Sequence, residues 1–305
     1  MKQGFDTVEL KESLEGALGF ELSSLVRLDG ASALNFRAVR ASDGLVFAVK
    51  CSPKSRQVMF DHLVCHLRET EGTKAVRRLF AESCPSTFRG CNVICLSWCE
   101  GLRRFPDQLT ESQLLAFLDE YLAFSAAMQR ATGILPHDPT LAWRAQALEN
   151  CRGFWGERLR RLIERELPES SVTYRREMLK VIHGDFHHGN FLFVDGRLNG
   201  FFDLEEFCEG YPADDSIRYF VCAAEHLRWY GRLRLGRILD RFAAAVRHLP
   251  YSLVEWETAI DCLLLRKLYM KTRDGRVGFA QTVNLLFRAR LYRRLRQIVR
   301  EVLRR

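Results

Sequence analysis

Residues 183–190 read HGDFHHGN, and residues 201–205 read FFDLE. Asp185 and Asn190 are five positions apart, and Asp203 follows Asn190 by thirteen positions. Phosphoryl transfer from ATP needs a carboxylate that orients an attacking hydroxyl and accepts its proton, and it needs oxygen ligands that hold magnesium on the phosphates. One short segment supplies all three groups. We therefore predict that Asp185 is the base and that Asn190 and Asp203 are ligands of Mg²⁺.

The spacing of His183, Asp185 and Asn190 matches the protein-kinase pattern H-R-D-x-x-x-x-N, but two features differ. Gly184 replaces the arginine, and Asp203 begins DLE where protein kinases have DFG. The variant HGDxxxxN with a following DxE or DxD resembles the aminoglycoside phosphotransferase and choline kinase superfamily of small-molecule kinases. The resemblance implies a two-lobed, protein-kinase-like α+β fold. A small N-terminal lobe would hold an antiparallel sheet and a helix, and a larger C-terminal lobe would be mostly helical.

The chain has 305 residues, which is enough for two lobes with separate cores. We expect a nucleotide-binding lobe over residues 1–101 and a catalytic, substrate-binding lobe over residues 102–305. Alternating hydrophobic and polar residues predict β structure over residues 20–50, with a hairpin turn at Asp43-Gly44.

Lys50 ends the strand-like tetrad FAVK. By itself it would be read as a solvated lysine at a strand end, but upstream of the HGD motif it is the candidate that pairs the α- and β-phosphates of ATP. The small residues around Gly30 and Ser32 predict a loop whose backbone N–H groups approach phosphates.

A helix over about residues 55–70 should follow, because its hydrophobic residues recur at helical spacing. Asp61 is our candidate for the carboxylate that holds Lys50, and Glu69 and Glu71 remain alternatives. A further strand over residues 92–98 leads to a break at Cys99-Glu100-Gly101. In kinase-like folds this segment is the hinge whose backbone binds adenine, so the resemblance implies nucleotide contacts at Ser97 and Cys99.

Residues 111–131 and 141–167 have the hydrophobic spacing of helices of the C-terminal lobe. His183 is predicted to be structural, because Asp185 already fills the place of the base. Asp215 resembles the aspartate of the family's DPxxDLA stretch, which braces the catalytic loop, and it could cap a helix that begins near Ser216. Glu205 lies two residues after Asp203 and is a third candidate for Mg²⁺ or its water shell.

The N-terminus lacks the hydrophobic region of a secretory signal, and the sequence lacks a run of 18 hydrophobic residues. The ten cysteines show no C-x-x-C pair, which favours free, buried thiols in a reducing compartment. We expect a cytoplasmic protein.

Residues 288–305 carry seven of the eight net positive charges. Hydrophobic residues at helical spacing make this segment a basic amphipathic helix, predicted over about residues 283–305. One interpretation packs the hydrophobic stripe on the C-terminal lobe and leaves the arginines, among them Arg293, Arg296 and Arg300, free in water. The other adds attraction to the anionic inner face of a membrane or to a glycolipid. The sequence has no module typical of nucleic-acid binding.

The sequence therefore predicts an ATP- and Mg²⁺-dependent enzyme that transfers the γ-phosphoryl group to a hydroxyl of a small molecule or glycan, with a sugar or lipopolysaccharide-type acceptor as one form. An aminoglycoside-type antibiotic kinase is an alternative. A protein kinase is disfavoured by Gly184 and by the missing DFG and APE elements. A non-catalytic pseudokinase is disfavoured because the set of Lys50, Asp185, Asn190 and Asp203 is complete.

Overall fold

The structure, a computed structural model, divides into two compact units. The first contains residues 1–102 together with segments 192–194 and 198–205, and the second contains the remaining residues. The residues that the structure describes are 6–28, 34–52, 86–131, 147–151, 153–167, 179–201, 208–227, 232–272 and 278–304.

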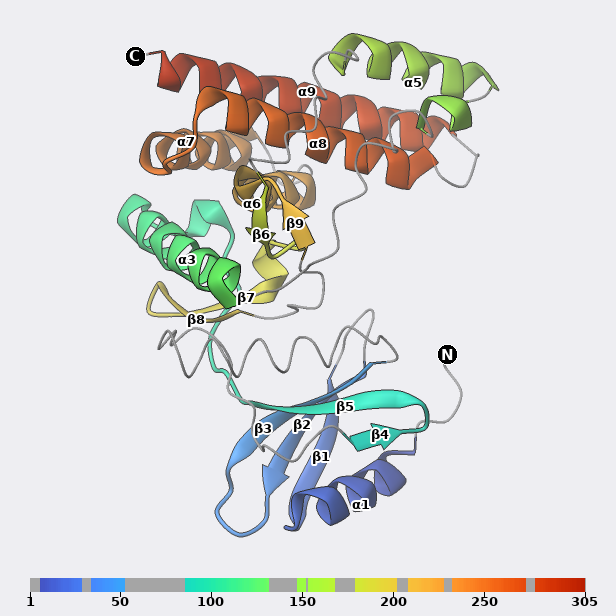
Figure 1. The fold of residues 1–305 in the computed structure, drawn as a ribbon, viewed down its shortest axis with the longest axis vertical. Coiled ribbons are helices and arrows are strands. Elements are labelled where there is room, and N and C mark those ends of the chain that lie inside the picture. The colour runs from blue at the N-terminus through green and yellow to red at the C-terminus, as the bar shows by residue number, and fades with distance from the viewer. Residues whose placement is uncertain are drawn as a thin grey trace. The chain divides into compact units, whose positions relative to one another are not determined.

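An antiparallel sheet of five strands forms the first unit, in the order β1-β2-β3-β5-β4 (Figure 1). Phe36 pairs with Val49, and Val49 pairs with Cys95, so a row of buried side chains crosses three strands. The strands predicted over residues 20–50 and 92–98 are confirmed. The strands are β1 (Leu22–Leu28), β2 (Leu34–Arg40), β3 (Val46–Ser52), β4 (Ser86–Phe88) and β5 (Cys91–Ser97).

The hairpin turn between β2 and β3 is also confirmed. Gly44 has a φ of 71°, a left-handed conformation that glycine adopts without steric cost. The Asp43 carboxylate accepts a hydrogen bond of 3.1 Å from the Leu45 N–H and pairs with Arg40.

Helix α1 (Thr7–Leu18) was not predicted from the sequence. Asp6 caps its start by accepting a hydrogen bond of 2.8 Å from the Val8 N–H, and Gly19 ends it with a φ of 70°. Leu10 and Leu14 are buried and belong to the core of the sheet. The predicted helix over residues 55–70 lies outside the described residues.

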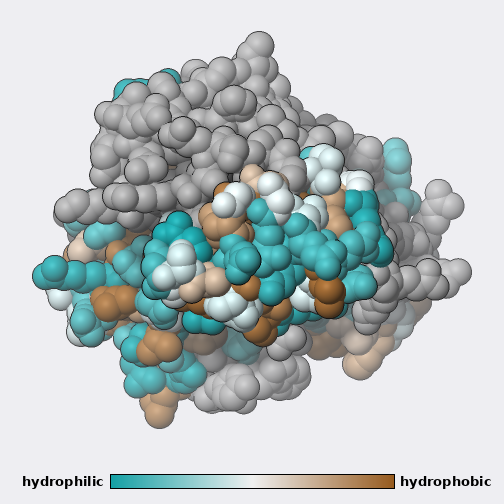
Figure 2. All heavy atoms as spheres, turned by 90° about the horizontal axis from the view of Figure 1, so that it is seen from below, coloured by the Kyte–Doolittle hydropathy of each residue, from teal (hydrophilic) through white to brown (hydrophobic). Residues whose placement is uncertain are grey.

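Exposed hydrophobic side chains of the first unit include Val8, Val26 and Leu45. Figure 2 views the molecule from below Figure 1, and there the hydrophobic residues of the described chain form small patches among hydrophilic ones. Scattered exposure of this kind is normal for a folded surface.

The second unit is mostly helical, and with the sheet of the first unit it confirms the predicted α+β class. A small antiparallel pair, β6–β9, accompanies the helices. Within the described residues, no helix is long and hydrophobic enough to cross a membrane. The elements are η1 (Pro106–Gln108), α3 (Glu111–Ala131), α5 (Gly153–Glu166), β6 (Lys180–Ile182), η4 (His188–Asn190), β9 (Cys208–Gly210), α6 (Pro212–Leu227), α7 (Arg232–His248), α8 (Leu253–Thr272) and α9 (Phe279–Leu303).

Two helix predictions need correction. The continuous helix predicted over residues 141–167 is interrupted at Cys151, and α5 begins at Gly153, whose φ is 73°. The helix predicted to begin near Ser216 begins at Pro212, because the fixed φ of proline suits the first helical position. Asp215 therefore lies within the first turn of α6 and does not cap it.

Strands β7 (Phe191–Val194) and β8 (Arg197–Phe201) form a hairpin. Its turn, Asp195-Gly196, has φ values of 51° and 77°. Positive φ at both turn residues matches the right-handed twist of the strands, and Asp-Gly is a preferred pair for it.

Arg293, Arg296 and Arg300 of α9 are not free, and this prediction was wrong. Arg293 hydrogen-bonds Glu166 of α5, Arg296 hydrogen-bonds Asp261 of α8, and Arg300 hydrogen-bonds Glu257 of α8. Arg296 also donates a hydrogen bond of 3.1 Å to the backbone oxygen of Glu166, so it links three helices. The hydrophobic stripe is confirmed: Leu291, Leu295 and Ile298 are buried and Val302 is half-buried.

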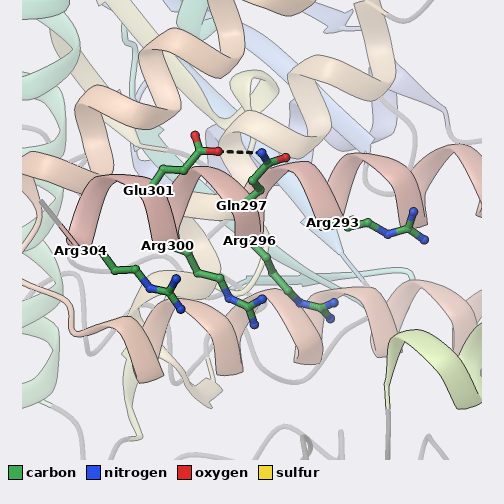
Figure 3. A pocket seen from close by; sticks show the side chains of 6 residues that line it. All are labelled: Arg293, Arg296, Gln297, Arg300, Glu301 and Arg304. Atoms are coloured by element: carbon green, nitrogen blue, oxygen red, sulfur yellow. Dashed lines mark hydrogen bonds between the residues drawn. The ribbon is translucent and has the colours of Figure 1, made fainter.

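An open pocket of about 520 Å³ lies along the C-terminal half of α9 (Figure 3). Arg296, Arg300 and Arg304 extend to one side of the helix, whereas Gln297 and Glu301 hydrogen-bond each other on the other side. The carboxylates of Glu166, Asp261 and Glu257 neutralise three of the arginines that line the pocket. The lining residues are Arg293, Arg296, Gln297, Arg300, Glu301 and Arg304.

We predict that Arg296→Gln lowers the free energy of unfolding by about 3 kcal/mol, because it removes the guanidinium that pairs with the buried carboxylate of Asp261. Urea denaturation would measure this. Arg294→Gln is the matched control: Arg294 is exposed, has no carboxylate partner among the described residues, and should change stability by about 0.5 kcal/mol or less. Equal stability of the two variants would contradict the structural role of Arg296.

Candidate functional site

The loop over residues 183–190 connects β6 to β7 in the second unit, and a buried aromatic cluster holds it. Phe186 is fully buried, and its ring centroid lies 4.2 Å from that of Tyr121 and 4.3 Å from that of Phe191. Phe117 of α3 stacks on Phe186 at 5.6 Å. Because Phe186 points into this cluster, its neighbour Asp185 is placed at the surface of the unit, where 36% of its side chain is exposed.

Asp215 braces the start of the loop. Its buried carboxylate accepts hydrogen bonds from the backbone N–H of His183 at 2.5 Å and of Gly184 at 3.1 Å, and from the hydroxyl of Tyr121 at 2.5 Å. Burial, and then the charge of Asp215, raise the pKa of Tyr121 well above its usual value, so the hydroxyl remains a donor. Gly184 has a φ of 76°, which favours glycine at this position.

His187 holds the carboxylate of Asp185 in place. Its Nδ1 accepts a hydrogen bond of 3.0 Å from the Gly189 N–H, so in the neutral ring the proton is on Nε2. Nε2 lies 3.3 Å from Oδ2 of Asp185 and can donate to it. Gly189 is required here, because a β-carbon at this residue would lie 2.6 Å from Cε1 of His187.

Asp185 is ionised at neutral pH. Burial opposes its charge, but the hydrogen bond and charge of His187 and the charges of Arg218 and His183 outweigh burial and lower its pKa to about 2. His183 is buried, and its Nδ1 accepts a 3.3 Å hydrogen bond from the Asp185 N–H. The backbone and the side chain of Asp185 are thus both restrained.

The side chain of Asn190 has an oxygen that could bind a metal ion. Its Nδ2 donates to the backbone oxygen of Asp185 at 2.9 Å and lies 3.3 Å from Oδ2 of Asp185, which leaves Oδ1 as the acceptor that a hard cation prefers. Among the described residues, no group of three or more histidine, cysteine and acidic side chains could hold a metal ion. The predicted carboxylate ligands, Asp203 and Glu205, lie outside the described residues.

A buried ion pair behind the loop was not predicted from the sequence. Arg218 lies one helical turn after Asp214 in α6, with 3.4 Å between Nη2 and Oδ2, and both side chains are almost fully buried. The pKa of Arg218 is raised, because the charges of Asp214 and Asp215 outweigh its burial. The i,i+4 spacing of opposite charges was a signal that could have found this pair. Tyr121, 94 positions from Asp215, gave no such signal.

In the first unit, Lys50 is a partly exposed residue of β3, opposite Asn35 of β2 and Ile94 of β5. Ser97 ends β5 opposite Phe47 of β3. These positions place Lys50 and Ser97 on adjacent strands of one sheet.

Residues 99–102 are held by the β7–β8 hairpin. The Cys99 thiol donates to the backbone oxygen of Asn199 at 3.3 Å, and Nδ2 of Asn199 donates to the backbone oxygen of Glu100 at 2.8 Å. Leu102 and Phe193 exchange two backbone hydrogen bonds. A β-carbon at Gly101 would lie 2.8 Å from the oxygen of Phe193, so only glycine permits this approach. This contact was not predicted from the sequence.

Several predicted site residues are not among those that the structure describes. Gly30, Ser32, Asp61, Asp203 and Glu205 lie outside the described residues. The same holds for Glu69 and Glu71, the alternative partners of Lys50.

Residues 26–250 match the family model described as the phosphotransferase enzyme family (APH). No curated protein matches the chain. The family match covers more than half of the sequence and includes the 183–190 loop.

Solved structures with the same fold are distant in sequence. The amicoumacin kinase hAmiN, in complex with AMP-PNP, Ca²⁺ and Ami, has a TM-score of 0.66 at 10% identity, over 94% of this chain and 93% of its own. The spectinomycin phosphotransferase APH(9)-Ia, in complex with ADP and spectinomycin, has a TM-score of 0.63 at 12% identity, over 99% and 98%. An aminoglycoside phosphotransferase from Alicyclobacillus acidocaldarius has a TM-score of 0.62 at 16% identity, over 95% of both chains.

We predict that Asp215→Ala destabilises the protein by about 3 kcal/mol or more, because it leaves two buried backbone N–H groups unpaired. Urea denaturation would measure the loss, and hydrogen exchange should show faster opening at His183 and Gly184. Tyr121→Phe is the control: it removes only one of the three donors and should cost about 1 kcal/mol. Equal effects of the two variants would refute the bracing role.

Proposed function

Because the chain belongs to the phosphotransferase enzyme family, we propose that it transfers the γ-phosphoryl group of ATP to a hydroxyl of a small molecule or glycan. Family membership confirms the resemblance predicted from the loop motif, and with it the predicted enzyme class. The observation that carries the proposal is the carboxylate of Asp185, which is ionised, partly exposed and restrained by His187 and Asn190.

In the proposed reaction, Asp185 orients the acceptor hydroxyl and receives its proton. The acceptor oxygen forms a bond to the γ-phosphorus, the bond from that phosphorus to the β,γ-bridging oxygen breaks, and ADP leaves. A carboxylate whose pKa is about 2 is a weak base, so its main contribution is orientation, with the proton transferred late. This order of events, with the proton transferred late, suits the loose transition state of phosphoryl transfer, in which the hydroxyl needs little activation.

Asn190, Asp203 and Glu205 would hold Mg²⁺, which when bound neutralises charge on the β- and γ-phosphates. Lys50 would place the α- and β-phosphates, with Asp61 as its partner. In the N-terminal lobe, proposed over residues 1–101, the phosphates would contact the backbone at Gly30 and Ser32, and adenine would contact that of Ser97 and Cys99. Residues 102–305 would supply the catalytic and acceptor sites.

Two acceptor classes fit this proposal. A sugar or lipopolysaccharide-type acceptor suits the net charge of +8, which mildly disfavours a polycation. An aminoglycoside-type antibiotic is the second candidate, and the similarity of the fold to those of the amicoumacin and spectinomycin kinases supports it. The proposal includes no nucleic acid. A cytoplasmic location at the inner face of a membrane remains a prediction, and the pairing of Arg293, Arg296 and Arg300 argues against those arginines as the contact.

We expect Asp185→Asn to lower turnover by roughly 10²–10⁴-fold while ATP affinity stays near normal, because the carboxylate acts on the acceptor hydroxyl. A coupled assay of ADP formation with pooled hydroxylated metabolites would identify the acceptor and measure the loss. Asp195→Asn makes the same charge change in the β7–β8 turn and should keep full turnover. Wild-type turnover of Asp185→Asn would rule out Asp185 as the base.

We also expect Asp203→Ala to abolish Mg²⁺-dependent nucleotide binding, and Asn190→Ala to weaken it less. Asp203 would bring a full charge to the ion, whereas Asn190 would bring only a carbonyl dipole. Calorimetric titration of Mg-ATP into each variant tests this. An unchanged magnesium dependence in Asp203→Ala would refute its assignment as a ligand.

A further inference from the structure

The face shared by α5 and the N-terminal half of α9 exposes hydrophobic side chains next to one another. The two helices pack together (Figure 1). Phe154 is 70% exposed, and Phe279 is 62% exposed. Val283 and Leu286 continue the surface along α9 at 48% and 39%. Trp155, which is half-buried, joins the helices, because its ring centroid lies 5.0 Å from those of both Phe154 and Phe279.

This surface, the α5–α9 face (Phe154, Trp155, Phe279, Val283 and Leu286), differs from the scattered exposed residues of the first unit. Fully burying one phenylalanine or leucine contributes about 1.5–3 kcal/mol, so five adjacent side chains represent a considerable unfavourable exposure. Contiguous exposed hydrophobic residues with polar neighbours mark interaction surfaces.

Arginines are among the charged neighbours of the face. Phe279, Val283, Leu286 and Arg290 recur at three- and four-residue spacing on one side of α9, and Arg294 follows one turn later. Arg290 and Arg294 are exposed and have no carboxylate partner among the described residues.

On α5, the guanidinium of Arg158 lies 5.5 Å from the ring centroid of Phe154 and 5.8 Å from that of Trp155. The exposed aromatic rings therefore lie beside a third positive charge, contributed by the other helix.

We propose that the α5–α9 face docks on an anionic lipid surface. Aromatic side chains with a hydrophobic body favour the boundary between headgroups and acyl chains. Arginines beside them would meet anionic headgroups, each contributing about a fivefold gain in binding, or roughly 1 kcal/mol. The positive charge that serves this surface comes from Arg158, Arg290 and Arg294. It does not come from Arg293, Arg296 and Arg300, which pair with carboxylates of α5 and α8.

Co-sedimentation of the full chain with phosphatidylcholine vesicles, with and without phosphatidylserine, tests the proposal. We expect binding to the phosphatidylserine vesicles at low salt and its loss at high salt, because salt screens the arginines. Arg290→Gln with Arg294→Gln should weaken binding roughly thirtyfold. Phe279→Ser should weaken it at least tenfold. Both changes are at exposed positions and should keep the fold, which thermal unfolding would verify.

The matched control is Arg300→Gln with Arg304→Gln, which removes the same charge from the other end of α9 and should change binding less than threefold. Equal loss in the two double variants would show attraction by net charge alone and overturn the proposal. Absence of binding by the wild-type protein at low salt would also overturn it. A dimer in solution that Phe279→Ser dissociates would assign the face to a second copy of the chain instead.

Discussion

The geometry of the 183–190 loop depends on one buried carboxylate, that of Asp215. A carboxylate without access to water is unfavourable unless donors compensate its charge. Three donors do so, and two of them are the backbone N–H groups of His183 and Gly184. The hydrogen bonds to this carboxylate therefore fix the backbone at the start of the loop. The fixed backbone in turn sets the directions of the side chains that follow.

The rest of the loop adds restraints of a different kind. Phe186 is anchored by the aromatic cluster, and Asp185 beside it is directed away from that cluster. His187 and Asn190 then restrain the carboxylate of Asp185 from two sides. Phosphoryl transfer depends on orientation of this kind, because most of the catalytic effect of the protein comes from positioning and charge.

Ion pairs also organise the helices of the second unit. Arg296 links α5, α8 and α9, and Arg288 of α9 pairs with Glu225 of α6 at 2.8 Å. Arginine suits such positions because its planar guanidinium donates in several directions at once. Much of the positive charge near the C-terminus is thus structural, whereas Arg290 and Arg294, which have no carboxylate partner among the described residues, lie beside the exposed aromatic residues of the α5–α9 face.

The sequence by itself determined the family, the fold class, the strands over residues 20–50 and 92–98, and the residues of the loop motif. These depend on local patterns: alternation in strands, a turn at Asp43-Gly44, and fixed spacing from His183 to Asn190. Only the tertiary structure decided which arginines of α9 are free, which donors surround Asp215, and that Asn199 holds the segment after β5. Those contacts join residues far apart in the chain, and no spacing rule relates them, because long-range packing brings them together.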